Sequence, residues 1–62
     1  MLADASRVRL LALLMDEELT VAELSVITRL KQPRVSTHLG KLKEAGLVVD
    51  RRSGVAAFYR AS

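Results

Sequence analysis

Two helix patterns stand so close together in this sequence that only a tight turn can join them, and this spacing constrains the fold more than any other feature. Thr20 and Glu23 have the spacing of a capping box, which predicts that a helix begins near Val21. Pro33 suits the first turn of the next helix, where its missing N–H costs nothing, and Gly46 suits the end of that helix. A helix, a short turn and a second helix form a helix-turn-helix unit.

The expected core follows from helical periodicity along the chain. A first helix is predicted from Asp4, a suitable N-cap, to about Met15. In the second helix, Leu24 and Ile27 are the expected core residues. The apolar face of the first helix is wide, so that helix needs contact on more than one side. The residues expected on this face are Val8, Leu11, Leu14 and Met15, widened by Leu10 and Leu13.

The end of the chain changes character and predicts strands. The segment LVVDRRSGVAAFYR is rich in valine and aromatic residues and contains the turn pair Ser53-Gly54. It predicts a β-hairpin with Arg51 and Arg52 near its tip, and a very short strand could precede the second helix. The expected fold class is therefore α+β and mainly helical. It is a winged helix-turn-helix of three helices plus a C-terminal β-hairpin wing, with residues 1–62 as one domain.

The formal net charge of +3 is unevenly distributed along the sequence. Residues 1–28 carry two arginines against five carboxylates, a net charge of −3. Residues 29–62 carry eight lysines and arginines against two carboxylates, a net charge of +6. A basic half on a small domain indicates a polyanionic partner. The alternative is a solvated basic face that binds nothing.

The helix predicted over residues 32–45 has an apolar side and a polar, basic side. Val35, Leu39 and Leu42 form a stripe that should face the core. The remaining side chains face outward or flank the stripe. The basic outer side is therefore the part of this helix that is free to touch a partner.

The outward side chains are suited to double-stranded DNA. In a helix-turn-helix, the N-terminal residues of the second helix meet base edges in the major groove. Gln32 can pair with adenine and Arg34 with guanine, whereas Lys41 is better placed for phosphate. Basic residues of the hairpin can lie along the backbone or the minor groove, or can simply be solvated. The candidate DNA-binding residues are Gln32, Arg34, Ser36, Thr37, His38, Lys41, Arg51 and Arg52.

Other classes of function have little support in the sequence. The absence of cysteine excludes disulfides and thiolate metal sites, and it allows a cytosolic setting. His38 is the only histidine and no acid–base arrangement of side chains is evident, so neither a metal, a cofactor nor an enzymatic activity is expected. The longest apolar run, residues 10–15, is too short to span a membrane. The N-terminus lacks the order of a signal peptide.

Four segments together resemble the DNA-binding core of ArsR-type winged-helix repressors. LADASRVRLLALL resembles the opening helix of that family, and ELTVAEL resembles the segment that follows it. QPRVSTHLGKLKEAGLV resembles the signature of the recognition helix, and RRSGVAAFYR resembles the wing. The resemblance covers nearly the whole chain. It implies a dimeric, cytoplasmic repressor whose affinity for its operator is altered by an effector.

The sequence departs from the family pattern at a few positions. Some metal-sensing members carry cysteines where this chain has Thr20 and Ala22, so their arsenite or cadmium site is not expected here. Lys31 stands where a serine N-cap is common in the family, and Arg29 where a glycine often closes the preceding helix. The turn between the two helices must therefore be held by other residues.

Two alternatives to a DNA-binding repressor stay open. Winged helices are sometimes used to dock other proteins, although the basic second half of this chain favours DNA. The chain is also similar to ArsR-like modules joined to a methyltransferase domain, so it could be the N-terminal module of a longer protein. For a repressor, a homodimer is expected with the first helix near its interface, because that helix carries more apolar surface than one contact face covers.

Overall fold

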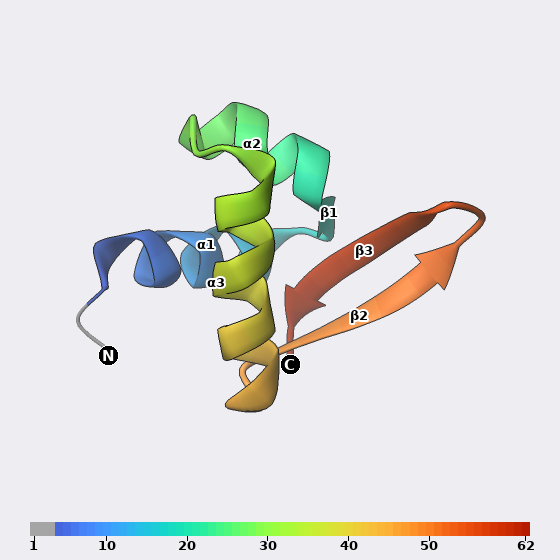
Figure 1. Cartoon of the computed structure of the whole chain (residues 1–62). Helices are drawn as coiled ribbons and strands as arrows, with labels where there is room; N and C mark the ends of the chain where they lie inside the picture. The colour runs from blue at the N-terminus through green and yellow to red at the C-terminus, as the bar shows by residue number, and fades with distance from the viewer. Residues whose placement is uncertain (1–3) are drawn as a thin grey trace.

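The computed structural model describes residues 4–62, which form three helices and a three-stranded antiparallel sheet (Figure 1). A long hairpin projects away from the helices, and α3 lies at the centre of the molecule. This is the winged helix-turn-helix that the sequence predicts. The elements in chain order are α1 (Ala5–Asp16), β1 (Leu19–Thr20), α2 (Val21–Thr28), α3 (Gln32–Glu44), β2 (Val48–Ser53) and β3 (Ala56–Ala61).

The first two helices begin at the predicted caps. The Asp4 carboxylate accepts hydrogen bonds from the backbone N–H groups of Ser6 and Arg7. At α2, the Glu23 N–H donates to Thr20 Oγ1 over 3.2 Å, and the Thr20 N–H donates to Glu23 Oε1 over 2.8 Å. The capping box is therefore confirmed, and it satisfies two donors that a helix start leaves unpaired.

The turn between α2 and α3 is held by side-chain hydroxyls. Arg29 adopts the left-handed conformation with φ of 63°, which glycine would take with less strain. The Lys31 N-cap of α3 makes no side-chain hydrogen bond to that helix. Instead, Ser25 Oγ donates to the Leu30 carbonyl, and the Leu30 N–H donates to Thr28 Oγ1. These bonds hold the turn although it lacks the glycine and the serine of the family pattern.

The end of α3 is a Schellman motif. Gly46 has φ of 76°, and its N–H donates to the Lys43 carbonyl over 2.9 Å. The Leu47 N–H donates to the Leu42 carbonyl over 2.9 Å, which closes the larger ring of the motif. The prediction that Gly46 ends this helix is confirmed. The motif reverses the chain and directs it into β2.

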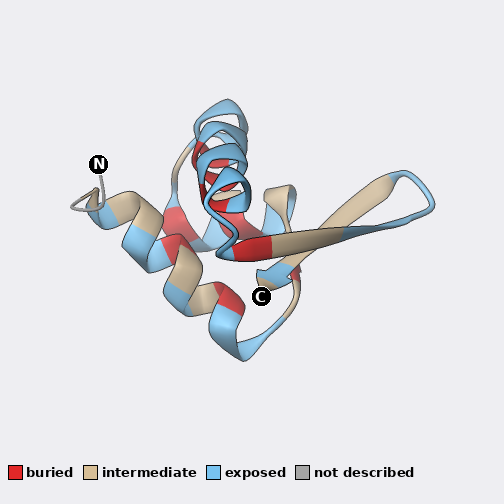
Figure 2. Ribbon diagram, turned by 90° about the horizontal axis from the view of Figure 1, so that it is seen from below, coloured by how far each residue is buried: buried red, intermediate tan, exposed pale blue. Residues whose placement is uncertain are grey.

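One apolar core lies between the three helices and the base of the sheet, and Figure 2 shows its buried segments facing one another. α1 and α3 contribute residues spaced three or four apart, as a single buried stripe requires, and α2 contributes Leu24. Strand β2 becomes progressively more exposed toward the hairpin tip, whereas most of β3 is half-buried and Tyr59 packs against the core (Figure 2). The core residues are Leu10, Leu14, Leu19, Leu24, Val35, Leu39, Leu42 and Val48.

The predicted core was partly wrong in the first two helices. Val8 is 57% exposed, Met15 71% and Ile27 42%. The buried stripe of α1 is centred on Leu10 and Leu14, and at 100° per residue Val8 and Met15 fall on the opposite side of the helix. Leu11 and Leu13 are partly buried against the core, as the widened face predicts.

The sheet has the strand order β1-β3-β2. Leu19 pairs with Tyr59, and Arg51 pairs with Phe58. The short strand β1 therefore joins the hairpin to the start of the helix-turn-helix. No helix within residues 4–62 is long and apolar enough to cross a membrane.

The corrected core predicts a sharp contrast between two neighbouring residues of α2. Leu24→Ala should lower the free energy of unfolding by about 2–5 kcal/mol, because Leu24 is fully buried and its truncation leaves a cavity. Ile27→Ala, the control, should cost less than about 1 kcal/mol because that side chain is exposed. Urea denaturation of both variants measures the difference. Equal losses would contradict this assignment of the core.

Candidate nucleic-acid interface

The outer side of α3 carries most of the predicted contact residues. Val35, Leu39 and Leu42 are buried, which turns the opposite side of the helix to solvent. The residues exposed in the structure are Gln32, Arg34, Ser36, Thr37 and Lys41. The first four lie within the first two turns of α3, and they form its exposed N-terminal cluster.

His38 does not belong to this exposed surface. Its side chain is 7% exposed, so the prediction that it flanks the outer side of the helix is wrong. It follows Val35 by three residues and precedes Leu42 by four, which keeps all three on the buried side. Neither ring nitrogen has a hydrogen-bond partner among residues 4–62. The imidazole is therefore a buried side chain on the core side of α3.

The two arginines of β2, Arg51 and Arg52, are in different environments. Arg51 Nε donates to Glu18 Oε2 over 2.9 Å, and one terminal nitrogen donates to Glu18 Oε1 over 2.8 Å. The Arg51 guanidinium also lies 4.8 Å from the centroid of the Phe58 ring. Arg52 is exposed and forms no ion pair with the described residues. The sequence placed both near the tip but gave no sign of this difference.

A second ion pair connects the hairpin to α3. Lys43 Nζ lies 2.7 Å from Asp50 Oδ1. The hydrogen bond from Lys43 lowers the pKa of Asp50, although partial burial opposes the shift. The same hydrogen bond raises the pKa of Lys43. Lys43 is thus paired with a carboxylate of the hairpin. Lys41, also exposed on α3, forms no ion pair with the described residues.

The sequence profile of the bacterial regulatory protein, arsR family, matches residues 4–49. The chain belongs to the ArsR family. The matched region begins at the N-cap of α1 and ends within β2, so it contains the whole helix-turn-helix.

Two relatives agree with this assignment to the ArsR family. The chain is 47% identical over 60 residues to the arsenic resistance transcriptional regulator ArsR1 of Pseudomonas putida, covering 95% of this chain and 47% of that protein. It is 40% identical over 62 residues to the arsenical resistance operon repressor of Escherichia coli, covering 98% of this chain and 53% of that protein. The chain therefore spans about half the length of the curated relatives it matches.

A solved structure also has a closely similar fold. The homodimeric winged helix-turn-helix DNA-binding domain Mb0332 of Mycobacterium bovis superposes with a TM-score of 0.90 at 35% identity. The match covers 97% of this chain and 56% of that one. The prediction of an ArsR-type winged helix is confirmed.

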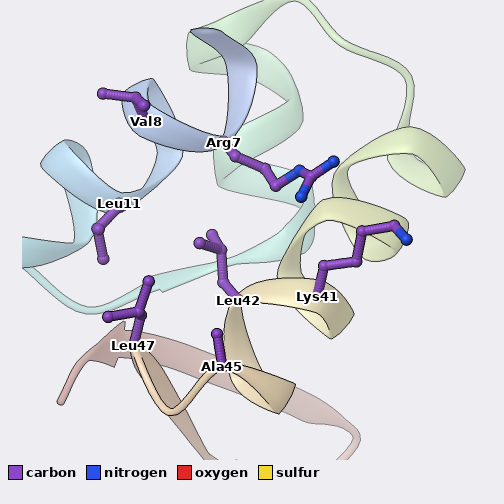
Figure 3. Close-up of a pocket in the computed structure, with 7 residues that line it drawn as sticks. All are labelled: Arg7, Val8, Leu11, Lys41, Leu42, Ala45 and Leu47. Atoms are coloured by element: carbon purple, nitrogen blue, oxygen red, sulfur yellow. The ribbon is translucent and has the colours of Figure 1, made fainter. Parts of the chain in front are cut away.

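This ArsR-family chain also has an apolar groove between α1 and the end of α3. Figure 3 shows Leu11 on α1 near Leu42 and Leu47, with Val8 farther along α1 and Arg7 reaching toward α3. Its volume is about 100 Å³, smaller than the roughly 300–1,000 Å³ of typical ligand pockets. Within residues 4–62, no cluster of three or more histidine, aspartate or glutamate side chains could hold a metal ion.

The Lys43–Asp50 pair predicts a defined response to acid. Because the pKa of folded Asp50 is lowered, the stabilisation from this pair is present above the usual aspartate pKa of about 3.9 and is lost as the pH falls through the lowered value. Lys43→Met should raise the pKa of Asp50, measured by NMR titration of its carboxyl carbon. Lys41→Met is the charge-matched control and should change it little. An unchanged pKa in Lys43→Met would contradict the pairing.

Proposed function

We propose that this chain binds double-stranded DNA sequence-specifically as the DNA-binding part of a transcriptional repressor. The observation that carries the proposal is the exposed N-terminal cluster of α3, Gln32, Arg34, Ser36 and Thr37, opposite a buried apolar stripe. A helix presented in this way fits the major groove with its first turns against base edges. The projecting hairpin then lies on the backbone or in the minor groove.

The contacts divide into two kinds. Gln32 and Arg34 have the bidentate hydrogen-bonding groups that read adenine and guanine. Ser36 and Thr37 can bond to several bases or to phosphate, although the Thr37 hydroxyl donates to the Pro33 carbonyl over 3.0 Å in the free protein. Lys41 and the hairpin supply positive charge for phosphate, which adds strength without sequence information.

The wider biological setting is proposed on the same grounds. The names of the relatives, a regulator and a repressor, support transcriptional repression. A cytoplasmic role without enzymatic activity is part of the same proposal. Both relatives are named for arsenic resistance. The present chain contains no cysteine, so it offers no thiolate for a soft metal ion. We therefore propose that no arsenite, cadmium or zinc site is built from these residues.

Assembly as a homodimer is proposed from the surface of α1. Val8 and Met15 are exposed, and Val8 borders the apolar groove. Exposed apolar surface of this kind favours contact with a second protein surface. The Mb0332 domain is described as homodimeric. A two-fold dimer would present two copies of α3 about 34 Å apart, which suits successive major grooves of a near-palindromic site.

The DNA proposal predicts distinct effects of substitutions on α3. With a duplex selected by repeated binding from a random pool, Arg34→Ala should cost about 1–3 kcal/mol and relax the preference at one base pair. Lys41→Ala should weaken binding to selected and random duplexes alike, and should reduce the salt dependence of log K by about one unit. Fluorescence anisotropy across salt concentrations measures both.

Arg9→Ala provides the control, because it removes an exposed cation from α1 and leaves α3 intact. It should leave sequence preference unchanged. Full affinity and unchanged base preference in Arg34→Ala would show that the assigned surface does not read DNA.

The dimer proposal predicts that an acidic residue at the exposed surface of α1 blocks association. Val8→Glu should shift sedimentation toward the monomer, because it would bury a charge in the interface. Leu13 is less suitable for this test because it packs against the core. Val26→Glu makes the same chemical change at an exposed position of α2 and is the control. The test uses the 62-residue chain and any longer natural protein containing it, and unaltered association in Val8→Glu would place the interface elsewhere.

A further inference from the structure

The middle of the hairpin is held from both of its faces. Asp50 and Arg51 are consecutive in β2, so their side chains project to opposite faces of the strand. Asp50 contacts Lys43 of α3, and Arg51 contacts Glu18, which immediately precedes β1. Two different parts of the helical body are therefore connected to neighbouring residues of one strand.

The Arg51 side of this arrangement has a specific geometry. Two guanidinium nitrogens bond to the two oxygens of Glu18, a bidentate pairing that fixes direction as well as distance. Arg51 and Phe58 are direct cross-strand partners, and the guanidinium lies over the Phe58 ring. The side chain thus reaches across β3 to the edge where β1 begins, and it joins all three strands of the sheet.

Arg52 lies one residue nearer the tip and has none of these contacts. It projects to the same face of β2 as Asp50, whose carboxylate meets α3. Arg52, the cation of β2 that is unpaired among the described residues, is therefore on the face that turns toward α3. Arg51, directed toward Glu18, is on the other face.

We propose that Arg51 is a positioning residue that fixes the angle of the hairpin through Glu18, and that Arg52 supplies the hairpin's contact with DNA phosphate. This rests on the proposed function in DNA binding and refines it. The sequence alone gave the two arginines the same role. The refined assignment also gives a carboxylate, Glu18, a supporting role in binding a polyanion.

The Glu18 carboxylate provides a test in which the two possible roles of Arg51 have opposite outcomes. If Arg51 positions the hairpin, Glu18→Gln should weaken binding about two- to fivefold, the range that an exposed ion pair can account for, with an unchanged salt slope. If Arg51 contacts phosphate and Glu18 merely competes for it, the same change should strengthen binding and steepen the slope. Glu17→Gln removes an adjacent exposed charge and controls for long-range electrostatics.

Substitutions of the arginines complete the test. Arg52→Ala should reduce the salt slope by about one unit, whereas Arg51→Ala should weaken binding with little change in slope. Arg51→Lys keeps the charge but loses the bidentate fork, so it should resemble Arg51→Ala under the proposal and wild type for a simple phosphate contact. The combination of Glu18→Gln with Arg51→Ala should be no weaker than Arg51→Ala alone, since both remove one interaction.

All affinities are measured by anisotropy with the selected duplex on the 62-residue chain, alongside urea unfolding to correct for the folded fraction. Amide hydrogen exchange of β2 and β3 in the free protein should be faster in Glu18→Gln and Arg51→Lys than in Glu17→Gln. This readout does not depend on DNA, so failure of the wild type to bind DNA would overturn the proposed function alone. Stronger binding in Glu18→Gln, or wild-type exchange and affinity in Arg51→Lys, would overturn the positioning role.

Discussion

The burial of three apolar side chains on α3 is the constraint on which the rest of the molecule depends. Val35 and Leu39 are fully buried and Leu42 nearly so, and together they fix the rotation of the helix about its own axis. Once that rotation is set, Gln32 and Arg34 can only face solvent. A rotation that exposed the stripe would place apolar side chains in water and charged groups in the core, both of which are costly. The outward chemistry of α3 is thus a consequence of its inward packing.

The hairpin depends on α3 in a different way. Val48 is buried at its base and Tyr59 is partly buried against the core, whereas the residues of β2 toward the tip are exposed. Its connection to the rest of the molecule includes the pairing of β3 with β1 and a few local features. The left-handed Gly46 turns the chain out of α3, and the Lys43–Asp50 and Glu18–Arg51 pairs act on the two faces of β2. Polar contacts have this role because the strand offers little apolar surface to bury.

Features encoded by neighbouring residues could be predicted from the sequence. The capping box at Thr20 and the glycine end of α3 involve partners only a few positions apart, so their spacing alone identifies them. The environment of Arg51 could not be predicted in this way. Its partner Glu18 is 33 positions away, and their meeting depends on the pairing of β1 with β3. Only the strand register brings these charges together.

The position of His38 shows a different limit of sequence analysis. Polarity suggested an exposed side chain, but its spacing from Val35 and Leu42 places it on the buried side of α3. Spacing was the better guide here because a small core requires a continuous stripe, whatever the chemistry of one member. The same geometry explains the exposure of Val8 and Met15, which are apolar but lie away from Leu10 and Leu14. In a chain this short, one core selects the side of each helix, and the apolar residues left outside it are the surfaces available for assembly.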